Sequence, residues 1–283
     1  MNKGNKRNKV KHKNGNQKEA IDSMKKEVST LIVGGSYFGV GYASAHPDCM
    51  ILEASHILGG DFHRGLRTAD VSGISIREAD TELGKLMIKH EVLKGEQFDV
   101  LKAAPVLHEY CDQSSMNIIM DAKLLSIEKV SDGYCVRYIT NSGIHEVHCE
   151  NVLDTSVLRD TCPEGMCISA KSLNLFTVRL QDTFEERLRK AAPDCIIEEG
   201  FNKDERVVKF PFPIEQKLPE ACETVVALWG QAFSEGEEKI LFLAQDFDYT
   251  CHKGAEESAP CTWVGADFAN PLSAFAAGMD YQM

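Results

Sequence analysis

The chain has 283 residues, of which 43% are hydrophobic, enough to bury a substantial core in one large domain or two smaller ones. Its net charge is −12, but residues 1–27 hold nine lysines and arginines against three acidic residues, which leaves +6 on this tail and −18 on the rest. An acidic body argues against nucleic-acid binding by the folded part, because phosphate binding needs a clustered basic face.

Residues 1–27 predict a disordered basic tail, because their Lys, Asn, Gln and Gly residues cannot bury apolar area. The tail contains no apolar stretch of the kind found in a secretory signal, and no segment of the chain reaches the 18–20 apolar residues of a membrane span. The ten cysteines show no CxxC pair or regular spacing, which is typical of reduced thiols. We therefore expect a cytoplasmic protein with no metal site.

The body begins with alternating strand-like and helix-like segments. VSTLIVGG at 28–35 predicts a buried strand, YFGVGYASAH at 37–46 a helix, and CMILEAS at 49–55 a second strand. The residues from 75 to 114 have apolar side chains at helical spacing and predict two helices, the second interrupted near Pro105.

The residues from 116 to 156 predict a β-meander that follows these helices. Strand-like segments are separated by the turn residues that hairpins need, such as Asn-Ser-Gly at 141–143. Beyond residue 160, strands are predicted around 171–180, 205–213, 223–230 and 238–247, and a helix over 182–194. The fold class predicted is therefore α/β, with a Rossmann-type domain and β-meander over 28–160 and a smaller, mixed β-rich lobe over 161–283.

The turn after the first strand has the glycines of a dinucleotide-binding loop. Gly34 provides the sharp turn, and Gly39 allows the helix to pack closely on the strand. Ser36 occupies the middle position, where a side chain is least favourable beside a pyrophosphate, although its hydroxyl can donate to a phosphate oxygen. Glu53 ends the second strand 19 positions after Gly34, where an acidic side chain accepts hydrogen bonds from an adenosine ribose.

Glu53 and the following Leu-Gly-Gly at 58–60 carry a more specific resemblance. Together with the glycine turn, they resemble the FAD-dependent oxidoreductases of the glutathione-reductase-like superfamily, in which Leu-Gly-Gly lies along the flavin diphosphate. The meander is similar to the family segment that ends in Ala-Thr-Gly, here Asp154-Thr155-Ser156. The resemblance implies FAD as cofactor and a small-molecule substrate bound at the second lobe.

The resemblance implies a set of cofactor-binding residues: Gly34, Gly35, Ser36, Tyr37, Phe38, Gly39, Glu53, Ala54, Gly59, Gly60 and Thr155. For the aromatic pair in this set, stacking on the flavin and filling the core are both open. The segment after the Gly-Gly pair also contains Asp61 and three candidate catalytic residues, His63, Arg64 and Arg67, which combine a titratable imidazole with two cations.

The sequence predicts an FAD-dependent oxidoreductase that acts on a small molecule. Ser36 and Ser156 depart from the family pattern, and the C-terminal segment that closes the flavin site in family members is expected to be missing. Three alternatives follow: a cofactor-free descendant that acts as an interaction protein, one half of a split flavoenzyme completed by a second polypeptide, and an NAD-binding protein.

Overall fold

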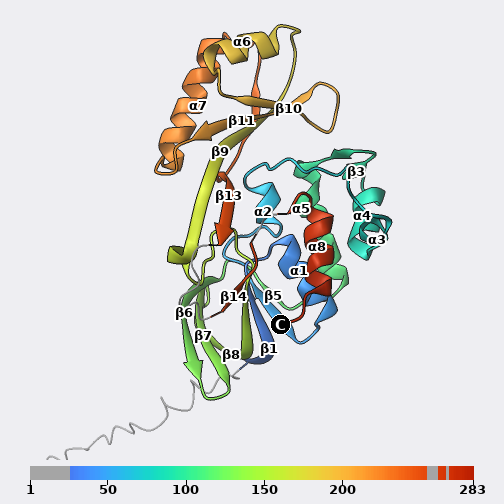
Figure 1. Ribbon diagram of the computed structural model, residues 1–283, viewed down its shortest axis with the longest axis vertical. Coiled ribbons are helices and arrows are strands. Elements are labelled where there is room, and N and C mark those ends of the chain that lie inside the picture. Colours follow the sequence, from blue (N-terminus) through green and yellow to red (C-terminus); the bar gives the residue numbers. More distant parts are fainter. Residues whose placement is uncertain (1–25, 254–260, 266–267) are drawn as a thin grey trace, which may run out of the picture.

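A computed structural model describes residues 26–253, 261–265 and 268–283. A Rossmann-type α/β domain forms the lower part of Figure 1, and a β-rich lobe stands at its upper end. The predicted basic tail lies almost entirely outside the described residues. Within the described part of the chain, no helix combines the length and apolar character needed to cross a bilayer.

The first sheet has the strand order β5-β2-β1-β8-β7-β6, in which β5, β2, β1 and β8 run parallel and the rest form an antiparallel meander. Its strands are β1 (Lys26–Val33), β2 (Cys49–Leu52), β5 (Ile118–Ile119), β6 (Lys123–Val130), β7 (Gly133–Thr140) and β8 (Gly143–Asp154). The predicted strand, helix, strand and meander are therefore confirmed.

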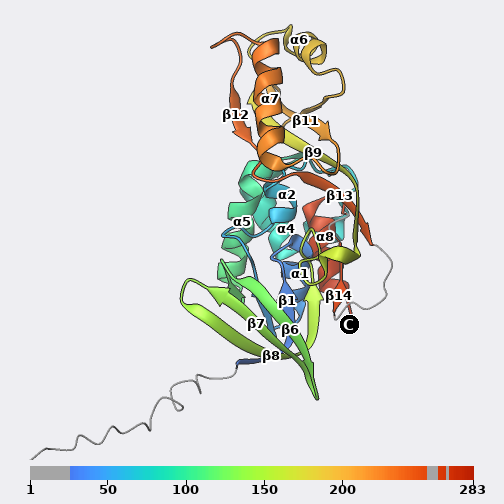
Figure 2. The same ribbon diagram turned by 90° about the vertical axis from the view of Figure 1, so that its left-hand side faces the viewer.

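Helices cover one face of this sheet (Figures 1 and 2). They are α1 (Tyr37–Ala45), α2 (Gly60–His63), α3 (Ile76–Ala79), α4 (Glu82–Lys89) and α5 (Val100–Gln113), and a small hairpin of β3 (Leu93–Lys94) and β4 (Gln97–Phe98) precedes the last of them. A second hydrophobic core lies between the parallel strands and the meander. The sheet is thus buried on both sides, as parallel strands require.

Helix α5 continues through Pro105, which the sequence predicted to interrupt it. Proline removes one backbone donor and normally bends or ends a helix. In α5, Asp99 caps the first turn by accepting from the backbone N–H groups of Leu101 and Lys102. The apolar face of the helix, with Ala103 and Leu107 fully buried, then holds it on the core. Tertiary packing outweighs the lost hydrogen bond.

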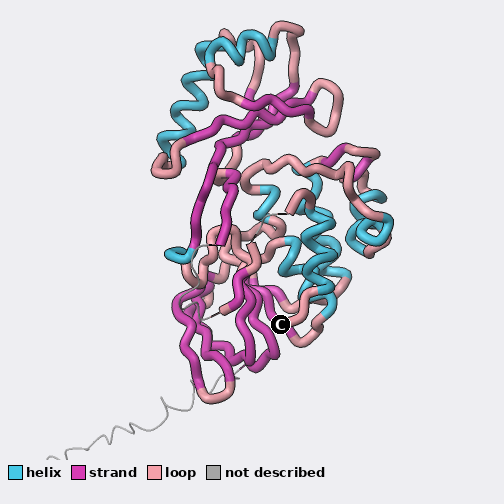
Figure 3. Tube along the Cα trace, viewed as in Figure 1, coloured by secondary structure: helices cyan, strands magenta, loops and turns pink. Residues whose placement is uncertain are grey.

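The second lobe is a five-stranded antiparallel sheet with two helices (Figure 3). A short 3-10 turn, η1 (Pro163–Gly165), leads into β9 (Met166–Val178), followed by α6 (Phe184–Ala191), β10 (Ile196–Glu199), β11 (Glu205–Phe212), α7 (Leu218–Ala232), β12 (Ile240–Leu243) and β13 (Asp248–Lys253). Strand β9 pairs with β11, β12 and β13, and with β13 it links the lobe to the first domain (Figure 1).

The prediction of a strand over 223–230 is wrong, because these residues belong to helix α7. The buried residues of this helix are Ala221, Val225, Trp229 and Ala232, which recur at helical spacing. The adjacent β-branched residues favoured a strand locally, but the longer apolar period and Pro219 near the helix start decide the outcome.

The chain returns to the first domain after the lobe, so not all of residues 161–283 belong to the lobe as predicted, and the missing flavin-closing segment stays a prediction. Strand β14 (Thr262–Trp263) pairs in parallel with the end of β8, and α8 (Pro271–Asp280) packs along α1. The two helices approach closely at glycines: a Cβ on Gly41 would lie 2.0 Å from the carbonyl oxygen of Phe275, and one on Gly278 would lie 2.1 Å from that of Phe38.

Candidate functional site

The register of the parallel strands brings three chain segments together at one edge of the sheet. Val33 at the end of β1 pairs with Leu52 of β2 on one side and with Asp154 of β8 on the other. The residues that follow, the glycine turn, Glu53 and Thr155, therefore lie side by side. Strand order changes direction at this point, and such crevices at the carboxyl ends of parallel strands are where α/β proteins bind ligands.

Gly34 makes the turn from β1 to α1 with φ of +93°, a left-handed conformation that favours glycine. A Cβ at this position would lie 2.7 Å from the backbone nitrogen of Ser156, so the turn also needs glycine for its close approach to the end of β8. Gly39 lies against β1 and β8, where a Cβ would meet the Thr155 hydroxyl at 2.6 Å. Helix α1 can therefore lie directly on the sheet.

Ser36 is the N-cap of α1 rather than an obstruction beside it. Its hydroxyl oxygen accepts a hydrogen bond of 3.1 Å from the backbone N–H of Gly39. Serine is among the best residues at an N-cap because it satisfies one of the donors that a helix start leaves free. The serine that replaces the glycine of the motif therefore stabilises the helix. It also leaves fewer free N–H groups for a ligand.

Glu53 is anchored to the glycine turn. One carboxylate oxygen accepts from the backbone N–H of Gly35 at 2.7 Å, and the other accepts from the backbone N–H of Ser55 at 2.8 Å and from its hydroxyl at 2.7 Å. These three bonds fix the side chain at the edge of the pocket. A carboxylate has about four acceptor positions, so capacity remains for a ligand hydroxyl.

The end of β8 is fixed by buried side chains. The Thr155 hydroxyl donates to the carbonyl oxygen of Gly34 at 2.7 Å. Asp154 is fully buried and accepts from the backbone N–H and the hydroxyl of Ser156, and likewise from both donors of Thr161. Trp263 of β14 donates from its indole nitrogen to the carbonyl oxygen of Ser156 at 3.0 Å. The segment after β8 is thus rigidly attached to the sheet.

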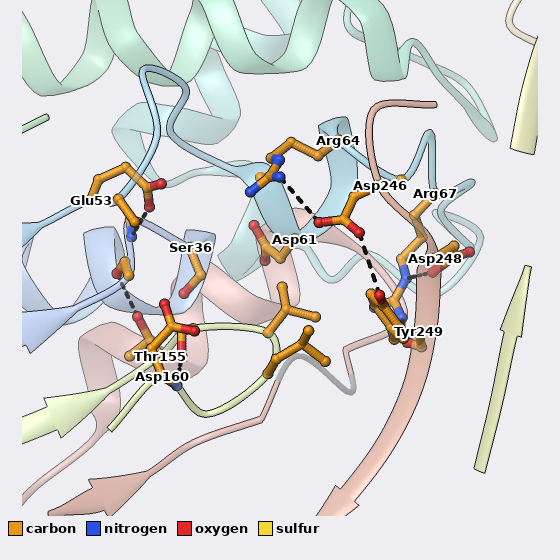
Figure 4. A pocket seen from close by; sticks show the side chains of 18 of the residues that line it. Ser36, Glu53, Asp61, Arg64, Arg67, Thr155, Asp160, Asp246, Asp248 and Tyr249 are labelled. Carbon is orange, nitrogen blue, oxygen red and sulfur yellow. Dashed lines mark hydrogen bonds and ion pairs between the residues drawn. The ribbon is translucent and has the colours of Figure 1, made fainter. Parts of the chain in front are cut away.

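A pocket opens at these strand ends and contains most of the site residues that the sequence predicts (Figure 4). It has about 850 Å³ of empty space, a figure that includes solvent at its mouth. The predicted residues that line it are Gly34, Gly35, Ser36, Glu53, Ala54, Gly60, Arg64, Arg67 and Thr155.

The remaining predicted residues lie elsewhere. Tyr37 and Phe38 are buried in the core, where Tyr37 contacts Phe62 edge-on and Phe38 stacks on Phe268, so neither lines the pocket. Gly39 and Gly59 do not line the pocket either: a Cβ on Gly39 would meet Thr155, and one on Gly59 would meet Tyr37. His63 turns away from it, and its Nδ1 lies 3.2 Å from the carbonyl oxygen of Val100.

The wall opposite the glycine turn was not predicted. It comes from the residues around the start of β13, Asp246, Phe247, Asp248 and Tyr249, while Asp160, after β8, lies beside Thr155 (Figure 4). These residues carry no local motif. They reach the pocket only because β13 pairs with β9 across the junction of the two domains, which no short-range pattern indicates.

Both pocket arginines are ion-paired with this wall. Arg64 lies 3.1 Å from Asp246, and the Nε of Arg67 lies 2.8 Å from Asp248. The second pair is mostly shielded from solvent, with side chains 16% and 14% exposed. These pairs join α2 and the turn after it to β13, and they leave the pocket acidic.

Asp61 lies at the centre of the pocket, between Ser36 and the Arg64–Asp246 pair (Figure 4). The residue is 9% exposed, and its Oδ1 has no hydrogen-bond partner within the described structure. Burial raises the pKa of Asp61 to about 7, although the charge of Arg67 acts in the opposite direction. A carboxyl group that titrates near neutral pH thus faces the start of α1.

No protein-family model and no curated protein sequence matches the chain. Solved structures do match its fold. The chain superimposes on p-nitrophenol 4-monooxygenase PnpA from Pseudomonas putida DLL-E4 with a TM-score of 0.58 and 10% identity, over 89% of this chain and 76% of the other. For a flavoprotein/dehydrogenase from Cytophaga hutchinsonii, the TM-score is 0.56 and the identity 12%, over 90% of this chain and 76% of the other.

A third match is aklavinone-11 hydroxylase, solved in a ternary complex with FAD and aklavinone. Its TM-score is 0.54 at 14% identity, and the alignment covers 91% of this chain and 62% of the hydroxylase. At these identities the likeness establishes the fold, a Rossmann-type domain with a β-rich lobe.

The glycine turn and Glu53 suit a dinucleotide, but the charge of the pocket does not. Gly34 and Gly35 present backbone without side chains, and Glu53 stands at the edge where a ribose would lie. The lining side chains include five carboxylates, from Glu53, Asp61, Asp160, Asp246 and Asp248, but only two guanidinium groups. The residues present therefore fit the ribose of a dinucleotide and its close approach to the glycine turn. They fit its diphosphate when one of the carboxylates is neutralised.

Proposed function

We propose that this chain binds FAD and acts as an FAD-dependent oxidoreductase on a small molecule, of the monooxygenase type named for several of its structural neighbours. The observation that carries the proposal is the alignment of three strand ends, which places the glycine turn, Glu53 and Thr155 around one pocket. The fold shared with FAD-bound aklavinone-11 hydroxylase supports the same cofactor.

Different residues of the chain would bind different parts of FAD. Glu53 would accept hydrogen bonds from the adenosine ribose, and the start of α1 with Ser36 would lie against the diphosphate. When bound, the flavin would supply the redox chemistry, and the protein would supply orientation and electrostatics. Arg64 and Arg67, ion-paired with Asp246 and Asp248, would line the side of the pocket nearer the second lobe.

A neighbouring pocket between the domains is our proposed substrate site. It is lined by three aromatic rings, Phe98, Phe176 and Phe201, with Thr68 and Glu199 among the polar groups. Thr68 directly follows Arg67, so the two pockets adjoin. Aromatic walls with a few polar groups favour a flat, largely apolar molecule.

Flavin uptake tests the proposal directly. The purified protein is titrated with FAD, and the absorbance between about 300 and 550 nm and the quenching of flavin fluorescence are followed. We expect saturable binding to the wild type, and weaker binding, by about tenfold, to Glu53→Gln, because the amide keeps only one of the two acceptor oxygens. Glu128→Gln on the exposed meander is the control. With FAD bound, p-nitrophenol is the probe for the second pocket, and a Phe176→Ala variant should lose its spectral shift.

An interaction protein without cofactor is the second candidate, and the acidic lining of the pocket favours it. A folded protein that takes up neither FAD nor NAD would support this candidate and contradict the first. The split-enzyme alternative, in which a second polypeptide completes the flavin site, stays a prediction. The cytoplasmic location stays a prediction.

A further inference from the structure

Asp61 is buried at a place where an anion would ordinarily be favoured. It lies in the first turn of α2, after Gly59 in left-handed conformation, and the neighbouring Phe62 is fully buried in the core. This arrangement fixes the backbone of Asp61 and directs its side chain into the pocket (Figure 4). One carboxyl oxygen, Oδ1, is buried and has no partner among the described residues.

The carboxyl group occupies the environment that a ligand phosphate would use. The backbone N–H groups of Tyr37, the first residue of α1, and of Asp61 itself lower the pKa of this carboxyl group and so favour its ionised form. The start of a helix attracts negative charge because its N–H groups are free and its dipole is positive there. An ionised Asp61 would therefore compete with a diphosphate for the same donors.

The pocket has no spare cation among its lining residues to offset two anions at this place. Arg64 and Arg67 are already paired with Asp246 and Asp248. Two like charges close together in a partly buried site disfavour each other, and the usual result is that one of them takes up a proton. Asp61 is the buried carboxyl group with an unsatisfied oxygen, so it is the group placed to do so.

We propose that Asp61 binds the diphosphate of a dinucleotide as a neutral carboxylic acid that donates its proton in a hydrogen bond to a phosphate oxygen. The proposal rests on the proposed FAD binding and adds to it that each ligand bound takes up one proton. No covalent bond is formed or broken, and the proton comes from solvent. Asp61 thus restricts tight binding to conditions in which it is protonated.

The charged and titratable groups around Asp61 agree with this role. Burial raises its pKa to about 7, Arg67 lowers it and Glu53 raises it further. On α1 the group that faces it is Tyr37, a fully buried phenol whose own pKa is raised by burial and by Asp61, so it stays neutral. The other acidic groups of the pocket are Asp160 after β8 and the two aspartates at β13, which already hold the arginines.

Proton linkage sets the size of the effect. If the bound state needs a protonated Asp61 and the free pocket titrates near pH 7, the dissociation constant for FAD rises about tenfold for each pH unit above that value. Asp61→Asn mimics the neutral acid, because its amide nitrogen can donate to a phosphate at any pH. The variant should bind with little pH dependence and more tightly than the wild type at high pH.

The experiment measures FAD affinity by fluorescence quenching at about pH 6, 7.5 and 8.5 for the wild type, Asp61→Asn and the exposed control Asp132→Asn. Calorimetry of the wild type in buffers of different ionisation enthalpy counts the protons taken up and needs no variant. We expect a roughly tenfold weakening for the wild type and the control between pH 7.5 and 8.5, uptake of close to one proton near pH 8, and a flat profile for Asp61→Asn.

A wild type that binds FAD with the same affinity at all three pH values and takes up no proton would overturn the role of Asp61 and leave FAD binding intact. The same holds if Asp61→Asn retains the pH dependence of the wild type. If the folded wild type and both variants bind no FAD even at about pH 6, the proposed function fails and the inference fails with it.

Discussion

Thr155 and Gly34 lie 121 positions apart in the chain, yet the Thr155 hydroxyl donates a hydrogen bond of 2.7 Å to the Gly34 carbonyl oxygen. The bond is buried and attaches the end of β8 to the turn after β1. It therefore fixes the two sides of the pocket at which the glycine turn and the segment after β8 meet.

Replacing Thr155 by valine keeps the volume and removes this bond. We expect the free energy of unfolding to fall by about 1–3 kcal/mol, because the buried Gly34 carbonyl oxygen loses a donor. Urea denaturation measures the change, and Thr250→Val, at an exposed position of β13, is the control. Equal midpoints for the two variants would show that the bond contributes nothing to stability.

Gly34→Ala should be more disruptive than its size suggests. The new Cβ would meet the Ser156 backbone at 2.7 Å, and the φ of +93° would be strained for any other residue. We expect a loss of roughly 1–3 kcal/mol or more in thermal or urea unfolding. The same substitution at Gly73 meets no atom within 4 Å and should change stability by less than about 0.5 kcal/mol. Similar losses at both positions would contradict the close approach of β8.

Variants of Ser36 test whether this serine serves as a helix cap or is only a departure from the binding motif. If its role is to accept from the Gly39 N–H, Ser36→Ala should cost about 1 kcal/mol of unfolding free energy and Ser36→Gly only a few tenths. Thermal melting of the two variants gives the comparison. An alanine variant as stable as the wild type would mean that the cap is not used.

The first domain was predictable because its signals are local. A buried apolar strand, a glycine turn and a helix follow one another within 28–46, and Glu53 follows at a spacing that the fold itself imposes. The meander was predictable for the same reason, since each of its strands pairs with its neighbour in sequence.

The other features of the fold and the site could not be predicted, because most of them depend on contacts between segments that are distant in the sequence. Whether Tyr37 faces a ligand or the core is decided by how α1 lies on the sheet, and the close packing of Gly39 on Thr155 directs this ring inward. Asp246 and Asp248 reach the pocket through a strand pair across the domain junction, and no pattern near residue 34 indicates them. In α7, a helical apolar period was present but the adjacent valines suggested a strand.

The contact of α8 with α1 predicts a strong difference between two glycines. Gly278→Ala places a Cβ about 2.1 Å from the Phe38 carbonyl oxygen, so α8 must shift, and overpacking of this kind costs about 1–3 kcal/mol. Gly230→Ala in α7 meets nothing within 4 Å and should stabilise by up to about 1 kcal/mol through helix propensity. Amide hydrogen exchange should show faster exchange in α8 for the first variant alone.

Asp61 also predicts how stability depends on pH. Its pKa is 3.8 in the unfolded chain and about 7 in the folded one, so the folded state binds more protons between these values and loses stability as the pH rises through them. The loss reaches at most about 4 kcal/mol above pH 7. Asp61→Asn should therefore unfold at higher urea concentration than the wild type at about pH 8, with a smaller difference at pH 4. A gain that is larger at the acidic pH would contradict the raised pKa, and Asp132→Asn is again the control.

Because β14 and α8 complete a domain that β1 begins, that domain cannot finish folding until the second lobe has been synthesised. About 100 residues of the second lobe leave the ribosome between β8 and β14, which takes on the order of ten seconds at usual elongation rates. During this interval the face of α1 that later receives α8 is without its cover. A chaperone that recognises apolar helix surfaces would find its target there until α8 has been synthesised and has packed on α1.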